Sequence, residues 1–316
     1  MIKESLTCKE CGQTFKSERS LHAHLKKHNL TVAEYYTQFY PRLNLLTGKP
    51  LPFKNKEEYF NKDFSSRGQM IKWLSEEKDS QKVKKYIIDK LRYRIECKEM
   101  KKAPCALDLE LSDLPPLDFY RQAFGSYGRV CAALDVPPTH PDPIVKNFFE
   151  EHKDCDDMKI FIDTREQKPL RFKRSEGLKL DFGDYTTGGD MYSYTYIDRK
   201  SEADFKSTLS VGFERFKKEL ERAREFNSFL YVMVESSIDK IKKNNVFAPH
   251  KVNMPYIFHN TKLLSREYSD VCQFLFSGGR KASEYLIPRL LKFGKTLWTC
   301  DMQYYIDKKI EEKESR

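Results

Sequence analysis

The chain has 316 residues, enough for about two domains. Charged residues make up 33% of it, and no apolar stretch approaches the roughly 20 residues of a membrane helix. We therefore expect a soluble, intracellular protein with no membrane partner, an expectation that fits a start lacking a signal-peptide pattern. Lys and Arg outnumber Asp and Glu by 57 to 47, so the net charge of +10 favours a polyanionic partner such as nucleic acid.

The first 30 residues carry a metal-ligand pattern. Cys8, Cys11, His24 and His28 have the Cys-x2-Cys-x12-His-x3-His spacing of a two-Cys, two-His zinc finger. A unit of about 25 residues cannot bury enough surface to fold alone, so bound Zn(II) would supply its folding energy. The six other cysteines are scattered, which argues against a disulfide framework. We predict a ββα zinc finger over residues 1–30.

The predicted finger has few side chains suited to reading bases. The helix positions that face base edges in such fingers fall on Ser17, Ser20 and Ala23, whose side chains are short. Arg19 is better suited to holding a phosphate. We predict a finger that adds affinity for DNA with modest sequence readout, and a structural or protein-binding finger is the alternative.

A basic helical region is predicted over residues 31–112. Helices are expected at 32–40 with a cap at Thr31, at 57–61, and from a cap at Ser65 or Ser66 to residue 74. The stretch 49–102 has 16 basic and 9 acidic side chains, a difference of seven charges. Most of the positive charge excess of the chain therefore lies between residues 49 and 102.

Residues 113–137 have the pattern of two helices joined by a turn. Gly125 ends the first helix and Ser126 caps the second, a helix-turn-helix-like arrangement. The Phe-Gly-Ser-aromatic turn followed by Ala-Ala-Leu resembles a small repeat of phage and bacterial homing endonucleases, which implies a DNA-binding accessory. Tyr127 stands where that repeat often has Trp, and an ordinary helical hairpin is the alternative. The Pro-rich residues 138–156 predict a stiff linker.

After residue 157, short apolar runs alternate with long amphipathic segments, the pattern of an α/β domain. Two of the strands should form a hairpin through a Gly-Gly turn at 187–190. The predicted strands are 160–162, 180–185, 192–200, 229–234 and 297–299, and the predicted helices are 205–226, 265–276 and 280–292.

Acidic residues gather at the ends of these strands. Asp163 and Glu166 follow the first strand, and Asp184 can approach Asp198 across the hairpin. Asp198 and Lys200 share a strand face, because side chains two apart point the same way. Two carboxylates suit a hard cation, Mg(II) or Mn(II), which activates water for phosphodiester cleavage, while a nearby lysine orients that water.

The carboxyl-terminal region resembles the nuclease domain of the XPF/Mus family of structure-specific endonucleases, a branch of the PD-(D/E)XK fold. The family pattern is Gly-Asp, a variable insert, Glu-Arg-Lys, three residues and Asp, with an upstream Asp-x-Arg-Glu and a downstream Arg. The matching residues are Asp163-Thr164-Arg165-Glu166, Gly183-Asp184, Asp198-Arg199-Lys200, Asp204 and Arg215. The resemblance covers residues 157–305, about half of the chain, and Asp198 departs from the usual Glu.

The resemblance implies an α/β core, a mixed sheet flanked by helices, over 157–310, with a tail at 311–316. Asp184 and Asp198 are the predicted magnesium ligands. The predicted catalytic residues are Asp163, Glu166, Asp184, Asp198 and Lys200, and the predicted substrate-binding residues are Arg165, Arg199, Asp204, Arg215 and, in the finger, Arg19.

The segment 205–226 is strongly charged and has a helical pattern. Its basic side chains suit a phosphate track, and a solvated face held by i,i+4 ion pairs is the alternative. The residues concerned are Lys206, Arg215, Lys217, Lys218, Arg222 and Arg224.

Three functions fit these features. The first is a magnesium-dependent DNA endonuclease directed by its amino-terminal modules, similar to a homing endonuclease of a phage or mobile element. The second is a flap or junction nuclease of repair or recombination, although the tandem helix-hairpin-helix region of eukaryotic family members is missing. The third is a non-catalytic zinc-finger DNA-binding protein. A homodimer through the nuclease domain would cut both strands, in a bacterial cytoplasm for a phage protein or a nucleus for a eukaryotic one.

Overall fold

The chain divides into two compact units, Met1–Tyr86 and Ile87–Arg316, which are described separately. The computed structural model describes residues 6–53, 56–144, 153–188, 194–248 and 251–314. Within this part of the chain, no helix is long and apolar enough to cross a membrane.

The first unit begins with a small ββα arrangement. Strands β1 (Leu6–Thr7) and β2 (Thr14–Phe15) pair antiparallel and lead into helix α1 (Glu18–His24). Ser17 caps α1, because its Oγ accepts the N–H of Ser20 at 3.2 Å. A short 3-10 helix, Leu25–His28, follows and carries the last of the predicted metal ligands.

A further helix completes the small core beneath this hairpin. Helix α2 (Val32–Phe39) starts at a capping box, in which Thr31 and Glu34 bind each other's backbone N–H groups. Tyr35 of α2 is fully buried, and its Oη accepts the N–H of Lys9 at 2.8 Å. The buried residues of this cluster are Cys8, Leu21, Leu25 and Tyr35. The ββα arrangement and α2 therefore share one core.

The predicted helices of the basic region are present. Ser66 caps α4 as expected, its Oγ accepting the N–H of Gln69. The helices are α3 (Lys56–Asn61), α4 (Arg67–Glu76) and the 18-residue α5 (Ser80–Cys97), which begins in the first unit and ends in the second.

The second unit opens with a helical layer that includes the predicted helix-turn-helix. Helices α7 (Leu117–Phe124) and α8 (Tyr127–Ala133) follow α6 (Ala106–Leu111). Gly125 has a φ of 83°, and Ser126 caps α8, so the turn forms as predicted. Whether this hairpin is a homing-endonuclease repeat stays a prediction.

The described part of the Pro-rich segment packs on this unit. Thr139 Oγ1 donates to the carbonyl of Ala103 at 2.6 Å, and Asp142 forms a β-bridge with Cys300. The predicted linker residues 145–152 lie outside the described residues.

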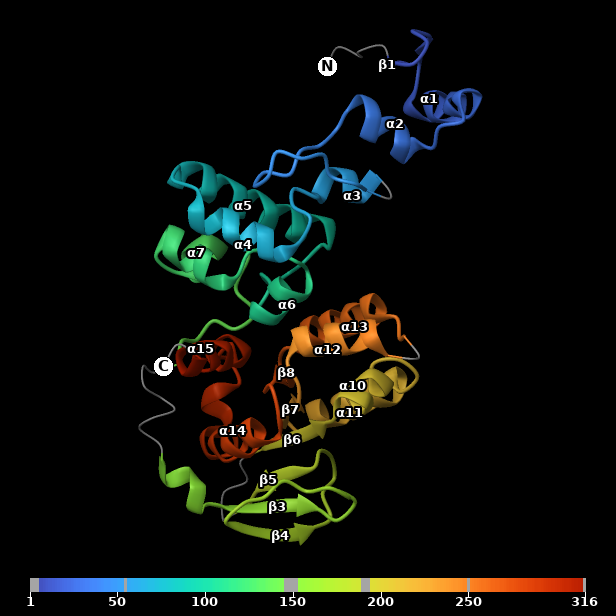
Figure 1. The fold of residues 1–316 in the computed structure, drawn as a ribbon. Helices are drawn as coiled ribbons and strands as arrows, with labels where there is room; N and C mark the ends of the chain where they lie inside the picture. The colour runs from blue at the N-terminus through green and yellow to red at the C-terminus, as the bar shows by residue number, and fades with distance from the viewer. Residues whose placement is uncertain (1–5, 54–55, 145–152, 189–193, 249–250, 315–316) are drawn as a thin grey trace. The chain divides into compact units, whose positions relative to one another are not determined.

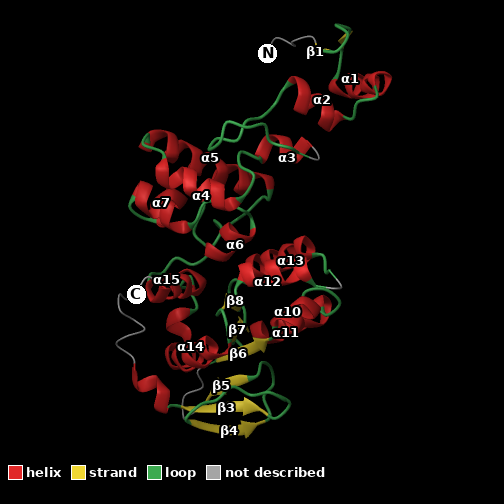
Figure 2. Ribbon diagram, viewed as in Figure 1, coloured by secondary structure: helices red, strands yellow, loops and turns green. Residues whose placement is uncertain are grey.

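A six-stranded mixed sheet, in the order β4-β3-β5-β6-β7-β8, forms the middle of the second unit (Figures 1 and 2). The β3–β5 and β5–β6 pairs are antiparallel, and the other neighbours are parallel. The strands are β3 (Lys159–Asp163), β4 (Arg174–Leu178), β5 (Tyr185–Thr187), β6 (Thr195–Lys200), β7 (Phe229–Val234) and β8 (Cys272–Phe276). The predicted α/β class and the antiparallel pairing of β5 with β6 are confirmed. Of the turn predicted at 187–190, Thr187 belongs to β5, and residues 189 and 190 lie outside the described residues.

Helices cover both faces of this sheet (Figure 1). Along β7, Leu230, Val232 and Val234 pack toward α10, α11, α12 and α13, whereas Phe229, Tyr231 and Met233 pack toward α14 and α15. The helices are α10 (Glu202–Thr208), α11 (Phe213–Glu225), α12 (Ile238–Phe247), α13 (Met254–Glu267), α14 (Arg280–Phe293) and α15 (Met302–Glu314).

Several predicted or missed elements need correction. The predicted strand at 180–185 is wrong for most of its length, because β5 begins only at Tyr185 and a loop precedes it. The predicted helix at 205–226 is two helices, α10 and α11, with a break at 209–212. The predicted helix at 265–276 is wrong, because α13 ends at Glu267 and 272–276 is strand β8, an apolar run buried on both faces that lacks strand alternation. The predicted strand at 297–299 is also wrong, since a 3-10 helix occupies Gly294–Leu297. Strand β4 was missed because all five of its side chains are exposed at the sheet edge, so no apolar pattern marks it.

Candidate active site

A cleft of about 870 Å³ lies at the ends of β3 and β6 in the second unit. It brings together all nine residues that the sequence predicts for the nuclease domain. They are Asp163, Arg165, Glu166, Asp184, Asp198, Arg199, Lys200, Asp204 and Arg215. Arg19, the tenth predicted residue, lies on α1 in the first unit.

Asp184 is presented to the cleft by a tight loop before β5. Gly183 has a φ of 67°, and a Cβ there would lie 3.0 Å from the carbonyl oxygen of Ile197, so glycine is required. The Asp184 N–H donates to that same carbonyl at 2.7 Å. Its carboxylate accepts the backbone N–H of Arg199 at 2.7 Å. The carboxylate of Asp184 is thus fixed against β6, as the hairpin predicts.

Asp198 and Lys200 form a buried pair on the neighbouring strand. Lys200 Nζ lies 2.5 Å from Asp198 Oδ1, and Asp198 is only 3% exposed. Burial by itself lowers the pKa of Lys200, but the Asp198 carboxylate outweighs it, so the pKa is raised and the ammonium stays charged. Among the described residues, Asp198 Oδ2 is buried and has no hydrogen-bond partner.

The carboxylates of the cleft repel one another. Burial and the nearby Asp198 raise the pKa of Asp184 to about 8. The same two causes raise the pKa of Glu219, a residue of α11 that the sequence reading missed. The Oε1 of Glu219 accepts the N–H of Gly183 at 3.3 Å, so this carboxylate also braces the loop that carries Asp184.

These residues fit a hard divalent cation. Buried polar oxygens are nearly always paired, so the unpaired Oδ2 of Asp198 beside the Asp184 carboxylate points to a missing positive partner. No three carboxylates in the described part of the cleft lie close enough to form a complete ligand cage. A cation held by two carboxylates keeps positions for water and substrate oxygens, as magnesium does.

Asp163 has a different environment. Its carboxylate accepts hydrogen bonds from the backbone and guanidinium of Arg165 and from the N–H of Leu180, all between 2.7 and 2.9 Å. Burial raises its pKa, but these hydrogen bonds outweigh burial and hold the pKa below its ordinary value. Its contacts favour a role in holding the strand end together, and its predicted catalytic role stays a prediction.

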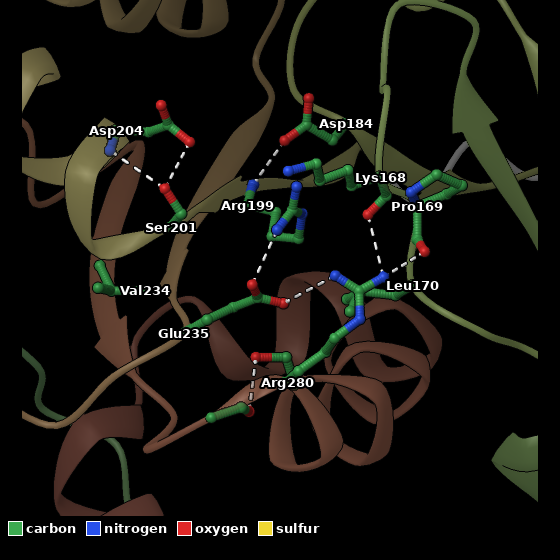
Figure 3. Close-up of polar contacts among 12 residues, drawn as sticks. Lys168, Pro169, Leu170, Asp184, Arg199, Ser201, Asp204, Val234, Glu235 and Arg280 are labelled. Carbon is green, nitrogen blue, oxygen red and sulfur yellow. Dashed lines mark hydrogen bonds and ion pairs between the residues drawn. The ribbon is translucent and has the colours of Figure 1, made fainter.

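Arg199 lies at the centre of an ion network on the opposite face of β6 (Figure 3). Its guanidinium binds Glu166 at 3.1 Å and Glu235 at 2.8 Å, and its side chain is 9% exposed. Arg280 approaches Glu235 at 3.8 Å. Glu235 and Arg280 were missed because they lie 36 and 81 positions from Arg199 and share no motif with it. The two ion pairs of its guanidinium favour a role of Arg199 in positioning its neighbours. The substrate-binding role predicted for Arg199 stays a prediction.

Three of the six candidate track residues on 205–226 line the cleft. Arg215, Lys218 and Arg222 are spaced by three and four positions along α11, so they share one face with Glu219. The helical spacing of Glu219 from Arg215 and Arg222 is the sequence signal that could have predicted its place in the cleft. The others pair elsewhere: Lys206 with Glu202, Lys217 with Glu267 and Arg224 with Asp270. Asp204 lines the cleft and accepts the hydroxyl of Ser201 at 2.6 Å at the start of α10.

A second candidate site lies in the first unit. The ligand atoms of Cys8, Cys11, His24 and His28 all lie within 4.8 Å of one another. His28 Nε2 is 3.0 Å from His24 Nε2 and 3.8 Å from Cys8 Sγ, and Cys11 Sγ is 3.2 Å from His24 Nε2. The edges of a zinc tetrahedron with these donors are about 3.3 to 3.8 Å long. The cluster predicted from spacing is therefore assembled, and its donors fit Zn(II).

The similarity of this chain to known proteins is low. No protein-family model matches it, and no curated protein is significantly similar to it. Among solved structures it is similar to XPF from Aeropyrum pernix, at 15% identity and a TM-score of 0.33, over 44% of this chain and 67% of that one. It is also similar to XPF from Aeropyrum pernix in complex with DNA, at 16% identity and a TM-score of 0.34, over 44% and 66%. Similarity this low establishes no mechanism, so function must follow from the cleft.

Proposed function

We propose that this protein is a divalent-metal-dependent DNA nuclease that hydrolyses phosphodiester bonds in the cleft of its second unit. The observation that supports this most strongly is the buried Asp184–Asp198 carboxylate pair with one unpaired oxygen, beside a charged Lys200. A buried carboxylate without a partner is costly, and a bound cation removes that cost.

In this proposal each group has a distinct part. Asp184 and Asp198 hold Mg(II) or Mn(II), which when bound lowers the pKa of a water and stabilises charge on the phosphate. Lys200 is kept charged beside them and neutralises the negative charge that develops on the attacked phosphate. Arg215, Lys218 and Arg222 form a cationic wall that binds the flanking phosphates.

The remaining predicted residues act around this centre. Asp163 holds Arg165 and the Leu180 backbone, and Glu166 holds Arg199. In the first unit, Cys8, Cys11, His24 and His28 hold Zn(II) for folding, while Arg19 on α1 contacts a phosphate. The proposed enzyme is of the homing type, directed to its DNA by the amino-terminal modules. A flap or junction nuclease is the alternative. The hypothesis of a non-catalytic DNA-binding protein fits less well, because a cleft that binds no cation would leave the buried Asp198 oxygen unpaired.

The test is incubation with a mixed pool of duplex, nicked and branched DNA, in Mg(II) and in EDTA. Cutting of one duplex sequence only in Mg(II) is expected for the homing type. Equal cutting of flaps or junctions of any sequence would identify the alternative. Equal activity in EDTA, or no cutting of any DNA, would rule out a metal-dependent nuclease. Sedimentation with and without DNA decides whether a double-strand break comes from a homodimer or from successive nicks.

A further inference from the structure

The residues after Glu166 form an anchored loop at the rim of the cleft. Lys168 sits on this loop, lines the cleft and has an exposed side chain. Figure 3 shows that side chain extended in the direction of Asp184. Neither the motif nor the helical periodicity assigns it a role.

The backbone of the loop is held at both ends. The carboxylate of Glu166 accepts the N–H of Lys168 at 2.7 Å while it also binds Arg199. Leu170 is 3% exposed, and its N–H donates to Tyr185 Oη at 3.1 Å. Lys168 is therefore an exposed residue on a loop whose ends are tied to the core.

Arg280 holds the middle of the loop (Figure 3). One guanidinium nitrogen donates to the carbonyl of Lys168 at 3.0 Å and to that of Pro169. Another faces Glu235, which binds Arg199. Arg280 is the first residue of α14, where a cation is unfavourable beside the positive end of the helix dipole. Its position is therefore explained by these contacts and not by the stability of α14.

The ammonium of Lys168, unlike its backbone, pairs with nothing. Within the described ranges it forms no ion pair or hydrogen bond, whereas Lys206, Lys217 and Arg224 each have an acidic partner. A fixed backbone with an unpaired cation at the rim of the cleft suits an anionic ligand, because little conformational entropy is lost on binding.

We propose that Lys168 binds a backbone phosphate of the nucleic acid next to the bond that is cut, and that Arg280 is a positioning residue that acts through Lys168. This inference rests on the proposed function of the cleft. Lys168 and the basic residues of α11 line the same cleft, so both would contact the backbone of one bound nucleic acid.

The experiment measures binding of a labelled duplex and a labelled branched DNA in EDTA, where cutting is stopped, over a range of salt concentrations. Lys168→Gln should weaken binding and reduce the slope of log K against log[salt] by about 0.9 for duplex DNA, one phosphate contact. Lys168→Arg should restore the slope. The matched control is Lys173→Gln, which removes an exposed lysine paired with Asp157 outside the cleft and should leave the slope unchanged.

Arg280→Gln should also weaken binding, with the thermal unfolding midpoint recorded to confirm that the variant folds. The double variant should bind no more weakly than Lys168→Gln alone, because both changes remove the same contact.

An unchanged slope in Lys168→Gln overturns the phosphate contact, and additive losses in the double variant overturn the positioning role of Arg280. If the slope depends on Lys168 but DNA is never cut in Mg(II), the proposed nuclease function fails and the Lys168 inference stands. If DNA is cut in Mg(II) and Lys168→Gln leaves the salt slope unchanged, only the inference about Lys168 fails.

Discussion

Among the described residues of the cleft, the polar contacts of single side chains leave one buried carboxylate oxygen, Asp198 Oδ2, without a hydrogen-bond partner. Lys200 satisfies one oxygen of Asp198, and the backbone of Arg199 satisfies one oxygen of Asp184. The second oxygen of Asp198 is buried without compensation. A buried carboxylate oxygen without a partner destabilises the fold, because it lowers the free energy of unfolding. The position of this oxygen is best explained by a ligand that binds there.

The first prediction at this scale concerns the two central side chains. Asp184→Asn and Lys200→Ala should each lower the cleavage rate by about 10²-fold or more while DNA affinity is kept, because both act on charge that forms during the reaction. Rates are measured in single turnover, and affinities in EDTA. Wild-type rates in both variants would contradict the assignment of the cleft.

The second concerns pH and the metal-free protein. The pKa of Asp184 is raised from 3.8 to about 8, so between these values the folded protein keeps a proton that the unfolded chain has lost. The associated stability is complete below the unfolded pKa and disappears as the pH rises through the folded pKa. In EDTA, the urea midpoint should therefore fall as the pH rises across this window.

Asp184→Asn is the control for that pH dependence, since an amide does not titrate. Its urea midpoint should vary less with pH than that of the wild type over the same window. Identical pH profiles for the two proteins would show that the Asp184 carboxyl has an ordinary pKa.

At the scale of elements, loops and caps place these residues. The β5–β6 hairpin brings Asp184 to Asp198, α11 braces the Gly183 turn through Glu219, and α14 holds the Lys168 loop through Arg280. The sheet edge thus carries short loops that are each tied to a helix. Such contacts keep side chains oriented on a sheet whose strands β7 and β8 are buried on both faces.

Gly183→Ala tests the turn before β5. A methyl group there meets the Ile197 carbonyl at 3.0 Å with φ at 67°, so we expect a loss of stability of about 1 kcal/mol or more and a larger loss of cleavage. Gly68→Ala is the matched control, because Gly68 lies in α4 and an added Cβ there meets only Ser66 Oγ, at an ordinary contact distance of 3.8 Å. This variant should gain up to about 1 kcal/mol of stability. Equal cleavage by both variants would argue against a required turn.

Helix α2 provides a prediction for the proposed zinc site of Cys8, Cys11, His24 and His28. Tyr35 is fully buried against Cys8, so Tyr35→Ala should destabilise the finger by about 3 kcal/mol or more and weaken Zn(II) binding. Tyr35→Phe keeps the ring, loses the Lys9 hydrogen bond and should have a smaller effect. Competition with a chromogenic chelator measures both. Wild-type zinc affinity in Tyr35→Ala would show that packing of α2 does not contribute to zinc binding by the finger.

For the whole molecule, charge and chemistry lie in different parts of the chain. The stretch 49–102 carries seven of the ten excess positive charges, whereas the cleft combines carboxylates with a basic helix face. The metal-ligand cluster belongs to the first unit and the cleft to the second. Binding and cutting should therefore respond to different substitutions.

His24→Ala tests this separation in the full chain. Loss of a zinc ligand should unfold the finger, weaken binding to the preferred DNA and lower the salt slope, while the single-turnover rate at saturating protein stays near that of the wild type. Asp184→Asn should give the opposite pattern. A parallel loss of rate and affinity in His24→Ala would indicate that the finger supports the cleft directly.

Several features of this protein are encoded locally and were predicted from the sequence. The caps at Thr31, Ser66 and Ser126, the turn at Gly125 and the zinc-ligand spacing each depend on residues within about one helical turn or one hairpin. Strand alternation likewise separated Asp198 and Lys200 from Arg199. These features could be predicted because a few residues close together in the sequence determine the backbone geometry on which they depend.

Only the tertiary structure decided which side chains meet across the cleft. Glu219, Glu235 and Arg280 come from three elements that strand order and helix packing bring together, and Lys168 gains its role from a loop anchored by one of them. The same packing determined that Arg215, Lys218 and Arg222 face the cleft while their basic neighbours pair elsewhere. Local periodicity shows which residues share a face, but the partner of that face depends on contacts between residues far apart in the chain.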